Sequence, residues 1–169
     1  MRKLWLVLVV VAATLALVPA RVSASSTYTD ALGGYEYWAS STDGKFAGTA
    51  SGALPGGWNA DVQHTALCLS CSPTATITGG SFSLTTVLRD VPTLVTGRFT
   101  GGTVQVVDPG ANCTRQTFTV SGLLGDVGAW WSGSGGGTFG VTLTHYRRSI
   151  FGRCVTYGAS VAGTLAISF

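Results

Sequence analysis

The stretch VTYGASVAGTLAISF, residues 155–169, decides the fold class. Every odd position from Val155 to Phe169 carries an apolar or small side chain, and most of the even positions between them carry Thr or Ser. Alternation with a period of two is typical of a β-strand that turns one face to a core and the other to water. We therefore predict a half-buried strand at this end of the chain.

Two other runs, residues 138–144 and 117–121, alternate in the same way between Thr or Ser and large apolar side chains. After residue 24, no segment keeps apolar residues at helical spacing for three turns, because Gly or Pro interrupts almost every window. The chain is therefore predicted to be all-β.

Turn signals separate these runs. They are Asp43-Gly44, Pro55-Gly56-Gly57, Gly79-Gly80, Gly101-Gly102, Asp108-Pro109-Gly110, Gly125-Asp126 and the tract 132–137. With no helix between the strands, neighbours in sequence pair antiparallel. We predict a single all-β domain, residues 25–169, an antiparallel meander closed as a small β-barrel, with a β-sandwich as the alternative.

A glycine is followed two residues later by a large apolar side chain at six places. The glycines are Gly52, Gly80, Gly97, Gly122, Gly137 and Gly163. In a strand, this spacing puts both residues on one face, where the missing side chain lets the strand bend or another backbone approach.

Residues 1–24 have the pattern of a secretory signal peptide. A basic start is followed by an apolar run of 15 residues, 4–18, and small residues at positions 22 and 24 precede a cleavage site before Ser25. The run is shorter than the ~20 residues of a membrane-spanning helix. We expect a cleaved leader, and a bacterial protein that is secreted or held at the cell surface or envelope.

Removal of this leader takes away Arg2, Lys3 and Arg21, and leaves seven basic and seven acidic side chains. No basic excess remains to bind a phosphate backbone, so nucleic acid is not expected as a partner. A membrane is not expected as a partner either.

Four cysteines follow the leader, and an even number in an oxidising compartment implies two disulfides. Cys113 is in register with the polar face of residues 115–121, and Cys154 with the polar face of residues 156–164. If these strands are neighbours, the two thiols lie on the same side of the sheet and can bond. We predict Cys113 bonded to Cys154, and Cys68 bonded to Cys71 across a tight turn.

A metal site is the alternative use of these residues, because His64, Cys68 and Cys71 have ligand spacing and His145 offers a fourth group. An oxidising compartment favours the disulfide. We predict no metal and no cofactor.

Two pairs of residues are candidates for ligand binding. His145 and Arg147 continue the apolar face of residues 139–143, and a basic pair at the end of such a stripe is placed to grip a ligand at a barrel mouth. Trp130 and Trp131 precede a glycine-rich loop, where an exposed indole can stack on a sugar.

No catalytic residue is assigned. Asp43, Asp108 and Asp126 lie in turn dipeptides, where a short carboxylate bonds its own backbone. The other carboxylates, including Glu36 and Asp61, are scattered, and no motif pairs two of them across a bond.

These observations favour a non-enzymatic extracellular binding or structural module whose ligand is a glycan or a small molecule. One alternative is a small outer-membrane β-barrel, for which the strands before residue 110 are predicted to be too short. The other is a secreted inhibitor or effector that acts on another protein.

Overall fold

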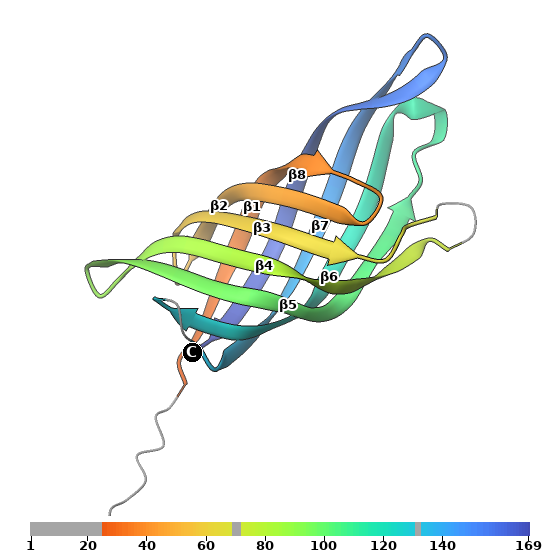
Figure 1. Ribbon diagram of the computed structural model, residues 1–169. Coiled ribbons are helices and arrows are strands. Elements are labelled where there is room, and N and C mark those ends of the chain that lie inside the picture. The colour runs from red at the N-terminus through yellow and green to blue at the C-terminus, as the bar shows by residue number, and fades with distance from the viewer. Residues whose placement is uncertain (1–24, 69–71, 131–132) are drawn as a thin grey trace, which may run out of the picture.

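The computed structural model describes residues 25–68, 72–130 and 133–169, so the predicted signal peptide lies outside the described residues. The described chain holds eight strands and one short 3₁₀ helix (Figure 1). They are β1 (Thr27–Ala39), β2 (Asp43–Gly52), β3 (Gly56–His64), β4 (Thr74–Leu88), β5 (Val91–Asp108), η1 (Ala111–Cys113), β6 (Arg115–Ala129), β7 (Gly135–Ile150) and β8 (Arg153–Ser168).

Every strand pairs antiparallel with its neighbour in sequence, and β1 also pairs with β8, so the sheet is a closed barrel. The closing register runs from Thr27 opposite Ser168 to Gly34 opposite Val161. The predicted all-β barrel is confirmed, and the sandwich alternative is wrong. In the part of the chain that the structure describes, no helix is both long and apolar enough to cross a membrane.

The interior of the barrel is an apolar core to which all eight strands contribute. Val161, Leu165 and Ile167 of β8 are buried, as their period-two spacing predicts. Trp58 fills part of the core, and its indole N–H donates to the carbonyls of Gly33 (3.2 Å) and Thr49 (3.1 Å). Only a small apolar cavity of about 40 Å³ remains in the middle of the core.

The two ends of the barrel differ. At the end where the β2–β3 and β4–β5 turns lie, which we call the closed end, Leu54 is 1% exposed and its backbone N–H donates to the buried carboxylate of Asp30 (2.7 Å). The Thr86 hydroxyl donates to the Pro55 carbonyl (2.8 Å) at the same end. The opposite end, with the β1–β2, β3–β4, β5–β6 and β7–β8 connections, is the open end.

The glycines of the repeated triplets lie where chain segments meet closely. A Cβ at Gly80 would overlap with the Asp61 carbonyl, and one at Gly163 would overlap with the Gly140 carbonyl. Gly80 also has φ +120°, which other residues rarely adopt. The interpretation of these glycines as close-approach points agrees with this geometry.

Three of the predicted turns are wrong. Gly79-Gly80, Gly101-Gly102 and Gly125-Asp126 lie inside β4, β5 and β6. These glycines lie within long strands instead of reversing the chain, and a neighbouring backbone occupies the space beside Gly80 and Gly102. As a result β4 has 15 residues and β5 has 18, so the predicted short strands before residue 110 are wrong as well.

Cys113 is bonded to Cys154, as predicted, with 5.4 Å between the Cα atoms. The assumption of neighbouring strands was wrong, because Cys113 ends η1 before β6, and β7 lies between β6 and β8. Closing a loop of this length stabilises a fold by ~3–4 kcal/mol in the chain-entropy model. Cys68 is also disulfide-bonded, and its predicted partner Cys71 lies outside the described residues.

The close approach at Gly163 gives a matched test of this packing. Gly163→Ala should destabilise the protein by ~2 kcal/mol, because its Cβ has no room beside the backbone of β7. Gly140→Ala on β7 meets nothing within 4 Å and should leave stability unchanged or raise it by up to ~1 kcal/mol. Urea unfolding followed by tryptophan fluorescence measures both. Equal effects of the two substitutions would contradict the close approach.

Candidate functional site

A cavity of about 260 Å³ opens into the barrel at its open end. Its deeper wall is apolar, and its rim carries hydroxyl, amide, imidazole and carboxyl groups. The residues that line it are Glu36, Ala39, Ser40, Ser41, Asp43, His64, Leu67, Val104, Gln116, Phe118, Leu143 and His145. Clefts of this kind, apolar with a few polar groups that converge, are the usual form of small-ligand sites.

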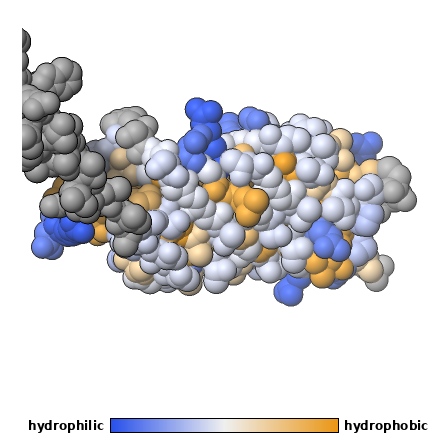
Figure 2. Space-filling view, turned by 90° about the horizontal axis from the view of Figure 1, so that it is seen from below, coloured by the Kyte–Doolittle hydropathy of each residue, from blue (hydrophilic) through white to orange (hydrophobic). Residues whose placement is uncertain are grey.

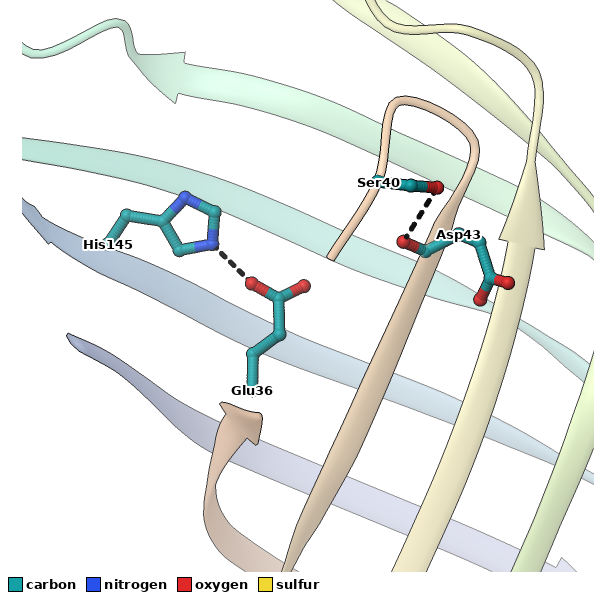
Figure 3. A network of polar contacts seen from close by, with 4 residues as sticks. All are labelled: Glu36, Ser40, Asp43 and His145. Atoms are coloured by element: carbon teal, nitrogen blue, oxygen red, sulfur yellow. Dashed lines mark hydrogen bonds and ion pairs between the residues drawn. The ribbon is translucent and has the colours of Figure 1, made fainter. Parts of the chain in front are cut away.

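The centre of this site is a hydrogen bond between Glu36 and His145, whose side chains point toward one another in Figure 3. His145 Nε2 lies 2.6 Å from Glu36 Oε2, and the two side chains are 16% and 9% exposed. The Phe118 ring packs edge-on against the imidazole, with 5.1 Å between the ring centroids. Breaking this partly buried pair would cost the Glu36 carboxyl its one hydrogen bond within the described residues.

Glu36 reaches His145 because β1 separates from β8 at the open end. Their pairing stops at Gly34, while β8 continues beside β7. Two residues further along, Glu36 faces inward, and a bulge at Tyr37 follows before β1 resumes its pairing with β2. Gly44 on β2 makes room, since a Cβ there would lie 2.8 Å from Glu36 Oε1. The pair thus links β1 to β7 on the inner side of β8, beyond the point where β1 has separated from β8.

Several polar atoms around this pair have no partner within the described residues. Glu36 Oε1, His145 Nδ1 and the Gln116 side-chain amide make no hydrogen bond there. Gln116 is 7% exposed and lies directly opposite His145 in the β6–β7 register. The cavity therefore presents a carboxylate oxygen, a ring nitrogen and an amide to whatever enters it.

Asp43 belongs to a second polar group on the outer side of β2 and β3. Its carboxyl points away from the Glu36–His145 pair (Figure 3). Burial raises the pKa of the Asp43 carboxyl, and the hydrogen bond and charge of Asp61 raise it further. Oδ1 of each carboxyl is buried without a donor, so one proton shared between them satisfies both. Lys45 lies 3.3 Å from Asp61 and 5.4 Å from the centroid of the Trp38 ring.

The four predicted ligand-binding residues do not come together. His145 lines the cavity as expected. Arg147 does not line it. Its backbone N–H donates to the Thr114 carbonyl, above the level of the cavity. Trp130 is exposed in the β6–β7 turn at the closed end, and Trp131 lies outside the described residues.

Sequence reasoning missed Glu36 and Gln116. The same period-two argument contains their signal, because Leu32, Gly34 and Glu36 share the inward face of β1, and Gln116 shares the inward face of β6 with Phe118. A polar residue in phase with buried apolar ones is informative. His64, the first of the possible metal ligands, contacts the Thr65 carbonyl through Nδ1 (2.8 Å). Among the described residues, no three His, Cys, Asp or Glu side chains are placed to hold a metal.

The raised pKa of Asp43 makes stability depend on pH. Because the folded state keeps this proton more tightly than the unfolded chain, whose pKa is near the ordinary value of 3.8, stability falls as pH rises from 3.8 through the folded pKa. Asp43→Asn removes this loss, so its stability relative to the parent should rise as the pH increases from 3.8 through the folded pKa, by less than ~1 kcal/mol for a partly exposed group.

Chemical denaturation at several pH values measures this difference. Asp90→Asn, in the β4–β5 turn at the closed end, is the matched control and should show no such rise. A stability difference for Asp43→Asn that falls with rising pH would contradict the shared proton.

Comparison with protein-family models, with curated proteins and with solved structures finds no match for this chain. The proposed function rests on the residues of the cavity and their surroundings.

Proposed function

We propose that this protein is an exported, non-enzymatic binding protein that takes a small hydroxylated molecule, about the size of one sugar ring, into the open end of its barrel. The observation that carries the proposal is the Glu36–His145 pair, buried at the rim with the unpartnered amide of Gln116 beside it. We assign no reaction to it.

The chemistry of the cavity supports a neutral, hydroxylated ligand. Among the described residues, no Lys or Arg lines it, so these residues offer no fixed cation to an anionic ligand. Hydroxyl groups can donate to Glu36 Oε1 and accept from the Gln116 amide, while the face of a ring packs on Phe118 and Leu143. The Gln116 amide makes no hydrogen bond within the described residues, so it is free to bond a ligand hydroxyl.

The outer wall of the barrel supports this proposal over the outer-membrane alternative. Membrane barrels turn apolar side chains outward and polar ones inward, whereas this interior is apolar. Figure 2 shows a mostly pale surface of intermediate hydropathy with isolated hydrophobic patches. Outward positions of β6, β7 and β8 carry Thr117, Thr119, Ser121, Thr138, Thr142, Thr144, Thr156, Ser160 and Thr164.

Export is supported by the leader pattern and by the Cys113–Cys154 disulfide, which is consistent with an oxidising compartment. A partly polar cavity at the open end of a small barrel favours a ligand carrier or sensor over an inhibitor. No segment of the described chain is identified as a protease-binding loop.

NMR titration of the isotope-labelled protein with methyl glycosides of common monosaccharides and with small polyols tests the binding site. We expect saturable shifts at Gln116, Phe118 and His145 with at least one probe. Glu36→Gln and Gln116→Leu should each lower the affinity for that probe about tenfold or more, because each variant loses a hydrogen bond to the ligand.

Trp130→Ala, at the closed end, is the control and should bind like the parent protein. If Trp130→Ala abolishes binding while Glu36→Gln leaves it unchanged, the site lies at the closed end and the assignment is wrong. If no probe gives a saturable shift, the hydroxylated ligand is wrong.

A further inference from the structure

Beyond the rim of the open end, β7 and β8 continue without a third paired strand as a two-stranded ribbon, residues 147–156. β6 pairs with β7 only as far as Tyr146, and β1 leaves β8 at Val161. Pairing between β7 and β8 continues to Ile150 opposite Arg153. Figure 1 shows this ribbon in blue, projecting past the barrel. Its tip is therefore clear of the other strands.

Phe151, at the tip of the ribbon, has an unfavourable backbone conformation. Phe151 and Gly152 form the turn with φ +48° and +75°, the left-handed pair of a tight hairpin in which Asn or Gly is usual. A bulky side chain is rarely found in this conformation. Phe151 is also fully exposed, at 102% of its reference surface, so it gains no packing in return. Strained positions that persist without a packing benefit mark functional segments.

The ribbon and its base carry arginines without acidic partners. Arg115, Arg147, Arg148 and Arg153 make no ion pair and no side-chain hydrogen bond within the described residues. Residues 146–158 contain no Asp or Glu. These four are more than half of the seven basic residues that follow the leader, so the balanced charge of residues 25–169 conceals a basic ribbon.

Two of these arginines lie over tyrosine rings. The Arg115 guanidinium lies 5.9 Å from the centroid of the Tyr146 ring, and that of Arg148 lies 5.5 Å from the Tyr157 ring. Stacking of this kind orders the planar group and leaves its N–H edge free, and that edge matches the oxygens of a phosphate. Tyr157 itself is 62% exposed.

We propose that the ribbon docks on an anionic lipid surface, with Phe151 inserted at the interface and the arginines on lipid phosphates. An apolar tip above a basic shaft is the arrangement that peripheral membrane contacts use. Exposed Val155, on the same face as Arg148, adds apolar surface beside the tip. An acidic polysaccharide would use the arginines and tyrosines but would leave Phe151 without a role. The barrel stays in water in this arrangement.

The disulfide fits this role. Cys154 lies in the ribbon and is bonded to Cys113, at the end of η1 on the barrel rim. A two-stranded ribbon in water is only marginally stable alone. The bond holds the ribbon to the barrel, so the tip meets a surface in a fixed orientation, at a lower entropic cost of docking.

Sedimentation with vesicles tests the proposal on the oxidised protein. Binding is measured with phosphatidylcholine alone and with a mixture of phosphatidylcholine and phosphatidylglycerol, and we expect it only with the mixture. The double variant Arg148→Gln/Arg153→Gln should lower the partition coefficient about 30-fold, from ~1 kcal/mol per arginine. Phe151→Ser should lower it about tenfold, because the ring no longer enters the interface.

Matched control variants remove two arginines, or one exposed apolar side chain, from other parts of the protein surface. Arg89→Gln/Arg98→Gln lowers the net charge equally, and Leu123→Ser removes an exposed apolar side chain from the barrel wall. Neither should change vesicle binding appreciably. Binding of soluble dextran sulfate is measured in parallel.

If Phe151→Ser binds vesicles like the parent protein while the arginine variant loses both vesicles and dextran sulfate, the ribbon binds anionic polymers and the lipid assignment is wrong. If the ribbon variants behave like their controls, or if the mixture binds no better than phosphatidylcholine, the ribbon is not a docking surface. Neither result bears on the proposed ligand site in the cavity at the open end.

Discussion

Pairing between β1 and β8 is the constraint on which the rest of this structure depends. It turns a meander with two open edges into a wall that separates an inside from an outside. Inward-facing side chains of all eight strands then share one core, and Thr and Ser lie on the outer face of β6, β7 and β8. The glycines let the strands coil tightly enough for this closure, because neighbouring backbones approach where a Cβ would stand.

The same pairing explains why the polar site is at one end. The pairing of β1 with β8 extends from Thr27 to Gly34 and ends there. At the closed end, Asp30 is used to tie the turn at Leu54. At the open end, the next inward-facing position after this pairing ends is Glu36, whose side chain contacts His145 on β7. Asp30 and Glu36, two inward-facing carboxyl residues of β1, thus have different roles. Only Glu36 lies beyond the point where β1 separates from β8.

Much of the fold follows from local pattern, because the period of two is a property of each strand by itself. The buried face of β8 and the inward direction of His145 were predictable for that reason. The Glu36–His145 contact was not, since it joins residues 109 positions apart and depends on where the closing pair of strands separates. The Cys113–Cys154 bond was predicted from polar faces, although β7 lies between the strands. Glycine pairs were read as turns because sequence alone does not show which backbone lies beside them.

Closure also sets an order of events in synthesis. Seven of the eight strand pairings join neighbours in sequence, so each can form as soon as the second strand of a hairpin is available. The eighth joins the first strand to the last, and β1 must wait for residues 161–168 before its free edge is covered. An uncovered edge can recruit a strand from another chain. The interval between the release of β1 and of β8 is therefore the period in which this chain is most exposed to misassembly, and a delay in the synthesis of β8 would lengthen it.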